Sequence, residues 1–201
     1  MPSPAPLQPD VYYHLYNRGT NGENLFREDE NYRYFLRLYA QHIAPVAETL
    51  AYCLMPNHFH LLVRTRADAE RLTRSERVGR LTPASQAFTN LFSSYTMAFN
   101  KRYGRTGSLF EHPFHRVAVE DDAYLTRLIV YIHRNPAKHG FTDDFRQWRY
   151  SSYAAILSRH PTHVARERVL DWFGGSAQFK SLHEQFLVDE VTAKLAPDDE
   201  R

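Results

Sequence analysis

The sequence has one cysteine among 201 residues, which excludes a disulfide-stabilised secreted fold and a metal cluster held by thiolates. No stretch approaches about 18 consecutive apolar residues, so no membrane-spanning helix is predicted. Residues 1–6 are rich in proline and lack the apolar core of a signal peptide. No internal repeat is visible either. We therefore expect a cytoplasmic protein with no membrane partner.

The excess of positive over negative charge is also small, since the formal net charge is only +2, but the charged residues are unevenly distributed along the chain. Between Arg64 and Arg105 there are nine Lys or Arg residues and three acids, a local balance of +6. The nine are Arg64, Arg66, Arg71, Arg74, Arg77, Arg80, Lys101, Arg102 and Arg105. Such a stretch favours a partner with a phosphate backbone, and these are the residues that we expect to contact it. The alternative is an ordinary solvated helix face and loop.

Two apolar runs joined by a Pro56-Asn57 turn form the most informative stretch, residues 52–63. His58 and His60 begin the second run. Side chains alternate faces along a strand, so both imidazoles point one way and Phe59 points the other. Two imidazoles side by side on a strand form half of a metal site. The alternative is a pair of exposed histidines on a sheet edge with no active site.

Apolar periodicity and turn residues predict an α+β fold. We expect strands over 12–16, 48–55, 58–64 and 114–119, and helices over 29–44, 83–104 and 121–135. This order is the βαββαβ pattern of a ferredoxin-like antiparallel sheet with helices on one face. A charged loop, expected to be mobile, covers 68–81. We divide the chain into a flexible lead (1–10), a main domain (11–157) and a helical C-terminal extension (158–201).

The second group of candidate residues lies on the helix after the fourth strand. Tyr131 and Asn135 are four residues apart and share a face if the helix persists. Pro136 is expected to end the helix there, which would leave the Asn135 amide at a frayed end. A tyrosine hydroxyl beside an amide oxygen fits a nucleophile next to a metal ligand. The alternative is a tyrosine packed under the sheet and an asparagine that caps the helix.

Four segments together resemble the single-tyrosine HUH transposases, and among them the REP-associated tyrosine transposases. The segments are Met55–His60, Gly107–Phe110, Tyr131–Pro136 and Trp148–Tyr153. The resemblance covers roughly residues 11–157. It implies a metal-dependent enzyme that cleaves and rejoins single-stranded DNA, at hairpins or palindromic repeats, through a 5′-phosphotyrosine intermediate. We expect Trp148 and Tyr153 themselves to pack against the core.

The resemblance also assigns roles to individual residues. His58 and His60 match the metal-binding histidines and Tyr131 matches the nucleophile. Asn135 falls where insertion-sequence relatives carry a glutamine that completes the metal site, and its shorter side chain reaches less far. Nitrogen and oxygen ligands of this kind suit Mg²⁺ or Mn²⁺. The sequence is compatible with a homodimer, in which the tyrosine acts in cis or from the partner.

Other histidines have no assigned motif position. His112 and His115 flank the fourth strand, and we expect them to cap the sheet edge rather than line the site, while His133 and His139 receive no role. Two other functions remain open. One is a domesticated protein that binds DNA hairpins with weak or no catalysis, and the other is a metal-binding protein with no DNA partner.

Overall fold

The computed structural model describes residues 5–69 and 82–185. Its centre is a four-stranded sheet of β1 (Tyr12–Arg18), β2 (Ala47–Leu54), β3 (His58–Thr65) and β4 (His115–Val119). The strand order is β2-β3-β1-β4, and every neighbouring pair is antiparallel. The helices α1 (Asp29–Ile43) and α3 (Pro83–Tyr103) connect the strands. The predicted ferredoxin-like α+β fold is confirmed.

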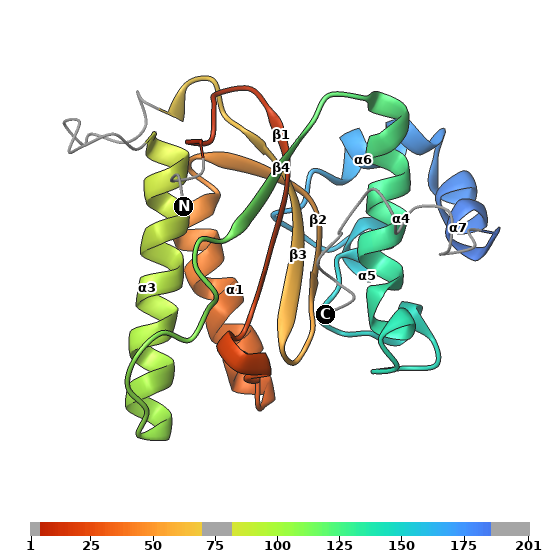
Figure 1. Ribbon diagram of the computed structural model, residues 1–201. Coiled ribbons are helices and arrows are strands. Elements are labelled where there is room, and N and C mark those ends of the chain that lie inside the picture. Colours follow the sequence, from red (N-terminus) through yellow and green to blue (C-terminus); the bar gives the residue numbers. More distant parts are fainter. Residues whose placement is uncertain (1–4, 70–81, 186–201) are drawn as a thin grey trace.

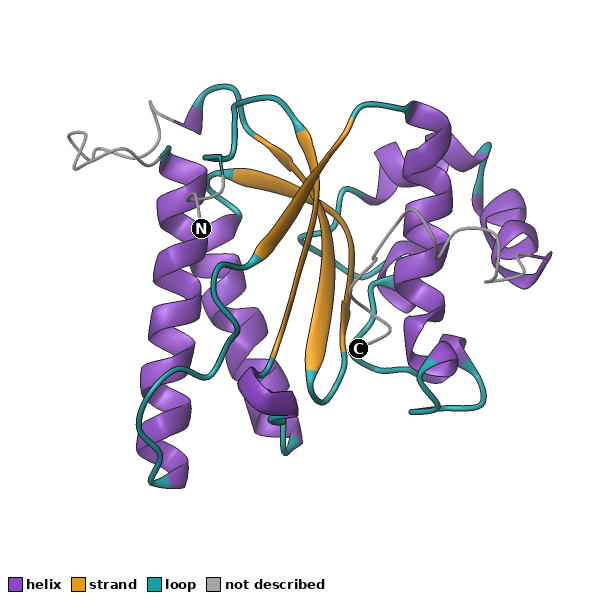
Figure 2. Cartoon of the chain, viewed as in Figure 1, coloured by secondary structure: helices purple, strands orange, loops and turns teal. Residues whose placement is uncertain are grey.

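Helices cover both faces of the sheet, as Figures 1 and 2 show, so the expectation of helices on one face holds only for the two helices that connect the strands. The pair α1 and α3 packs on one face, and α4 (Asp122–Lys138) packs on the other. The short α5 (Tyr153–Leu157), α6 (Arg166–Phe173) and α7 (Ser176–Gln185) lie on the same side as α4. Two 3₁₀ turns, Thr20–Gly22 and Phe145–Gln147, complete the described elements. No helix among residues 5–69 and 82–185 is long and apolar enough to cross a bilayer.

Alternation along the strands divides the apolar residues between two cores. Leu15, Phe59 and Leu61 point toward α1 and α3 and belong to the first core. Leu62, by contrast, belongs to the second core with residues of α4, α6 and α7. Phe59 is fully buried beside the rings of Phe35 and Phe92. Burying a side chain of this size stabilises the fold by about 1.5–3 kcal/mol, so Phe59 fixes which face of β3 the histidines occupy.

The helix α4 does not stop at Asn135, as its sequence predicted, but continues to Lys138 with Pro136 inside it. A proline in this position removes one backbone donor, yet the following bonds can still form. The amide of His139 donates to the carbonyl oxygen of Asn135 at 3.0 Å, so the helical pattern is kept past the proline. Asn135 is therefore held on the helix and is 1% exposed, not frayed.

The chain before β1 and the chain after α5 both contact the body of the molecule. Leu7 is fully buried, and its amide donates to Ser85 Oγ at 2.9 Å. At the other end, Val169 and Phe179 are buried in the same core as α4. Trp148 is partly buried and donates from Nε1 to the Leu54 carbonyl, and Tyr153 is 6% exposed. The predicted packing of these two aromatic residues is confirmed.

Candidate active site

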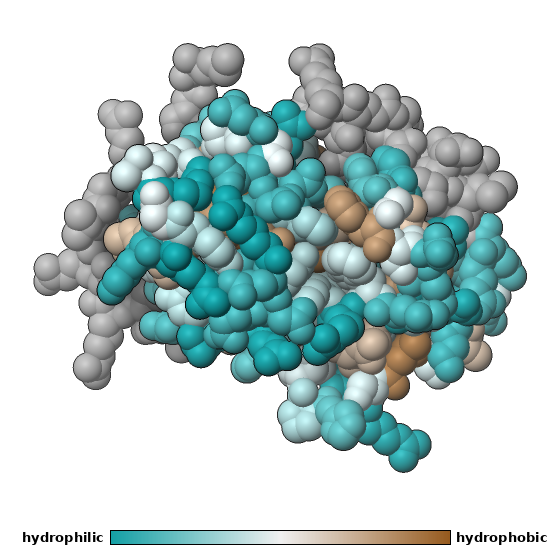
Figure 3. Space-filling view, turned by 90° about the horizontal axis from the view of Figure 1, so that it is seen from below, coloured by the Kyte–Doolittle hydropathy of each residue, from teal (hydrophilic) through white to brown (hydrophobic). Residues whose placement is uncertain are grey.

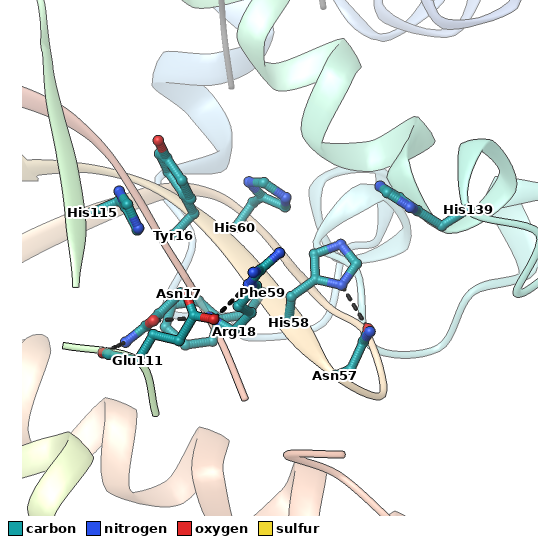
Figure 4. Close-up of a pocket in the computed structure, with 10 residues that line it drawn as sticks. All are labelled: Tyr16, Asn17, Arg18, Asn57, His58, Phe59, His60, Glu111, His115 and His139. Atoms are coloured by element: carbon teal, nitrogen blue, oxygen red, sulfur yellow. Dashed lines mark hydrogen bonds and ion pairs between the residues drawn. The ribbon is translucent and has the colours of Figure 1, made fainter. Parts of the chain in front are cut away.

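The two predicted metal ligands begin β3 and line a cleft of about 400 Å³, which we call the histidine cleft (Figure 4). Its lining residues are Tyr16, Asn17, Arg18, Asn57, His58, Phe59, His60, Glu111, His115 and His139. As alternation predicts, His58 and His60 lie on the face opposite the first core, while the Phe59 ring is buried in that core. Both histidines are poorly exposed, at 9% and 0%. They are therefore not a pair of exposed histidines on a sheet edge.

The rings of His58 and His60 are 5.5 Å apart between centroids and nearly perpendicular. In each ring Nδ1 lies at hydrogen-bond distance from a neighbour, Asn57 Oδ1 at 2.7 Å for His58 and His14 Nε2 at 3.0 Å for His60. Nε2 is consequently the nitrogen of each ring suited to coordination. Burial, and then the neighbouring His14 and His58, lower the pKa of His60 well below its ordinary value. His60 is therefore neutral at pH 7, as a metal ligand must be.

The helix α4 brings Tyr131 against the same histidines. The Tyr131 ring centroid lies 5.6 Å from that of His60 and 6.3 Å from that of His14, edge to face in both cases. The ammonium nitrogen of Lys138, two turns further along α4, is 5.5 Å from the Tyr131 ring centroid. Tyr131 is only 2% exposed, and it does not line the histidine cleft.

Asn135 lies one helical turn beyond Tyr131 and is joined to it. Its Nδ2 donates to the Tyr131 carbonyl oxygen at 3.2 Å. Its Oδ1 is buried and accepts no hydrogen bond from the described residues. A buried amide oxygen without a donor is costly, at about 1–3 kcal/mol, and is the kind of atom that a cation would satisfy.

Several residues of this cleft were not predicted from the sequence. Tyr16 pairs across the sheet with His60 on one side and with His115 on the other. The three rings form a row, with centroids 5.7 Å and 4.7 Å apart. His115 therefore lines the cleft. The expectation that it caps the sheet edge was wrong, because His115 is the first residue of β4 and pairs across the sheet with Tyr16. The ring of His139, just beyond α4, lies 4.7 Å from that of His58.

The imidazoles of the cleft do not by themselves complete a metal site. Within the part of the chain that the structure describes, no three His, Cys, Asp or Glu side chains are arranged around one possible ion. A cation held by His58 and His60 would thus take its further ligands from other oxygen atoms. Asn135 Oδ1 is the protein oxygen that the sequence suggests, and two imidazoles with an amide oxygen fit Mn²⁺ or Mg²⁺.

The basic residues predicted to contact DNA fall into two groups. Arg64, with Arg66 beyond it, lies where β3 ends and pairs with Asp10 at 2.5 Å. Arg102 and Arg105 lie with Lys101 at the far end of α3, where they pair with Glu28 and Glu23 at 2.8 Å and 3.0 Å. The remaining four, Arg71, Arg74, Arg77 and Arg80, lie outside the described residues.

The second basic group lies at the same end of the sheet as the histidine cleft. Gly19, which follows β1, donates from its amide to the Asn57 carbonyl, and Glu23 a few residues on pairs with Arg105. Seen from this end, in Figure 3, the surface is mainly hydrophilic with scattered apolar patches. Of the predicted DNA contacts that the structure describes, Lys101, Arg102 and Arg105 are thus those at the cleft end of the sheet.

Comparisons with known proteins were made for sequence and for fold. No protein-family model matches the chain. A Haemophilus influenzae protein named "Putative REP-associated tyrosine transposase" is 29% identical over 109 residues, which are 53% of this chain and 58% of that protein's length. A solved "REP associates tyrosine transposase bound to a REP hairpin" matches with a TM-score of 0.57 at 15% identity, covering 80% of this chain and 88% of the other. The sequence match confirms the predicted resemblance, and the structural match confirms the fold.

Proposed function

Because the chain resembles the REP-associated tyrosine transposases, we propose that it is a metal-dependent endonuclease and strand transferase for single-stranded DNA. Its substrate would be DNA with hairpins or palindromic repeats, such as the REP hairpin bound by the structural relative. One observation carries the proposal. The ring of Tyr131 lies 5.6 Å from that of His60, so α4 brings the candidate nucleophile to the candidate metal ligands across about 70 residues of sequence.

In the proposed reaction the phenolic oxygen of Tyr131 bonds to the scissile phosphorus while the bond from phosphorus to the 3′-oxygen breaks. The phenolic proton is lost, and the departing 3′-oxygen gains a proton to become a 3′-hydroxyl. The downstream strand stays attached through a 5′-phosphotyrosine. This link conserves the phosphodiester bond energy, so a 3′-hydroxyl can reverse the step and join strands without ATP.

Tyrosine is a poor nucleophile at neutral pH, because its reference pKa is about 10. A bound divalent ion would supply polarisation of the scissile phosphate and would offset the charge that develops on its oxygens. His58, His60 and Asn135 are the residues that we propose hold it. The buried Asn135 Oδ1, which lacks a hydrogen-bond donor among the described residues, supports this assignment.

The proposal requires a change at Tyr131, since its side chain is 2% exposed in this structure. The hydroxyl must become accessible to a scissile phosphate in the histidine cleft, and we propose that the phenol ring turns to expose it. The same burial favours the second candidate function, a hairpin-binding protein with weak or no catalysis. In that case Tyr131 is a packing residue, and the histidine cleft contributes to DNA binding alone.

A covalent-adduct assay separates the two functions. The protein is incubated with Mn²⁺ and a hairpin-bearing single strand labelled at its 3′ end, because the phosphotyrosine link retains the downstream fragment. We expect a labelled band at the size of the protein on a denaturing gel. It should disappear with Tyr131→Phe and persist with Tyr124→Phe, a matched change earlier on α4.

Two results would contradict the proposed enzymatic function. One is a wild-type protein that shifts the hairpin in a native gel but forms no adduct, which supports the binding function. The other is an undiminished adduct with Tyr131→Phe, which excludes Tyr131 as the nucleophile. Chelation of the divalent ion should abolish the adduct, and an adduct that survives it contradicts the metal requirement.

A further inference from the structure

His14 of β1 is a buried histidine with no role in the proposed chemistry, and it lies directly behind a proposed metal ligand. We propose that His14 is a positioning residue, which accepts a hydrogen bond from Nδ1–H of His60 and so presents the Nε2 lone pair of His60 to the metal ion. This inference rests on the proposed function, because it takes His60 to be a metal ligand.

The sheet register brings these two rings together. Tyr16 is the direct cross-strand partner of His60, and His14 is two residues away on β1, paired with Leu62. Residues two apart on a strand share a face, so His14 and His60 are diagonal neighbours on the face that α4 covers. They are 1% and 0% exposed.

The contact between them is a hydrogen bond in the plane of the rings. His14 Nε2 lies 3.0 Å from His60 Nδ1, within the normal range for such a bond. The ring centroids are 5.2 Å apart and the planes differ by 20°, so the rings meet edge to edge and nearly coplanar rather than face to face. This geometry places one proton between the two nitrogens.

Coordination decides which ring carries that proton. A neutral imidazole has one N–H and one lone pair, and a ligand that uses Nε2 must be protonated on Nδ1. His60 is therefore the donor and His14 Nε2 the acceptor. His58 shows the same arrangement, because its Nδ1 faces Asn57 Oδ1 at 2.7 Å, and an amide oxygen can only accept. Each ligand thus has its own acceptor behind it.

Neighbouring rings hold His14 in place. The Tyr16 ring centroid lies 5.0 Å from that of His14, and the edge-to-face contact with Tyr131 comes from α4. Phenylalanine has nearly the same shape as histidine, so His14→Phe keeps a ring in this position and removes the acceptor. Glutamine offers an amide oxygen, so His14→Gln is the conservative variant that restores acceptance.

The test measures Mn²⁺ binding without DNA, by counting free Mn²⁺ through its electron paramagnetic resonance signal. Loss of a ligand's hydrogen-bond partner typically weakens metal binding by about 10–100-fold. We expect that loss with His14→Phe, recovery of much of the affinity with His14→Gln, and no change with His163→Gln, an exposed control far from the cleft. Circular dichroism melting confirms that each variant is folded.

A spectroscopic readout follows the tautomer directly. Long-range ¹H–¹⁵N correlation spectra of the metal-free protein should show His60 with its proton on Nδ1, and this pattern should be lost in His14→Phe. If wild type binds Mn²⁺ and His14→Phe binds it with the same affinity, the inference is overturned and the proposed function stays intact. A wild-type protein that binds no Mn²⁺ overturns the metal-dependent function and the inference with it. A metal-free His60 protonated on Nε2 overturns the inference alone.

Discussion

A buried chain of hydrogen bonds makes the docking of α7 sensitive to acid. It runs from Ser152 Oγ to His133 Nε2 at 2.7 Å, from His133 Nδ1 to His183 Nε2 at 2.8 Å, and from His183 Nδ1 to the Phe179 carbonyl at 2.7 Å. A carbonyl can only accept, so His183 Nδ1 carries a proton and donates it to Phe179. Burial favours the neutral form of both rings, in which His133 Nδ1 donates to His183 Nε2. A further proton would place a positive charge in this buried cluster, which burial disfavours.

The sign and size of the effect follow from the pKa of His183. Burial lowers it from 6.5 to about 4, although the hydrogen bond to Phe179 opposes the shift, and the Arg134 guanidinium lowers it further. Between pH 6.5 and about pH 4 the unfolded chain binds a proton at His183 that the folded chain does not, so the free energy of unfolding falls as the pH falls. His183 alone should remove about 2 kcal/mol between pH 7.5 and pH 5, and about 3 kcal/mol by pH 4. Burial, then His183, also lowers the pKa of His133, which adds in the same direction.

Guanidinium unfolding at pH 7.5 and pH 5 measures this loss. The variant His183→Phe keeps a ring among Phe145, Phe173 and Phe179, but it has no proton to bind. We expect the variant to be less stable at pH 7.5, because His133 Nδ1 loses its acceptor, yet to lose about 2 kcal/mol less than wild type on going to pH 5. Equal losses in the two proteins would refute this account of the His183 site.

Three further predictions concern single positions. Gly19→Ala would bring a Cβ to 1.9 Å from the Glu23 carbonyl oxygen, so the turn after β1 must shift, and thermal melting should show a loss of at least about 2 kcal/mol. Asn135→Ala should weaken Mn²⁺ binding in a titration without unfolding the protein, and a fully retained affinity would exclude this amide as a ligand. Arg105→Ala should weaken hairpin binding and reduce its salt slope by about one, whereas Lys180→Ala, an exposed position on α7 outside the predicted contacts, should change neither in a gel-shift series.

The sheet and one face of β3 could be predicted because they depend on local patterns. Alternation in His58–His60 is a property of any strand, and the large Phe59 can be buried on one side only. The order of strands and helices then restricts the topology to few choices. These features need no knowledge of which residues meet across the sheet.

The rest of the cleft depends on the register of the strands and on a helix that continues past a proline. His14 and Tyr16 share a face of β1, which the sequence shows, but only the pairing of Tyr16 with His60 makes them part of the site. His115 enters by the same route through β4. Pro136 predicted a helix end, whereas packing of α4 on the sheet outweighs its missing donor and carries the chain on to His139 beside His58.

The placement of α4 links the proposed nucleophile, Tyr131, to the proposed amide ligand, Asn135. Tyr131 and Asn135 are one turn apart, about 5–6 Å along the helix face, and the Asn135 amide donates to the Tyr131 carbonyl. Moving the whole helix to expose Tyr131 would displace Asn135 as well. Rotation of the Tyr131 side chain alone would leave Asn135 where it is. We therefore expect the proposed reaction to proceed by a side-chain rotation on a fixed helix, in which the phenol ring leaves its edge-to-face contacts with His14 and His60.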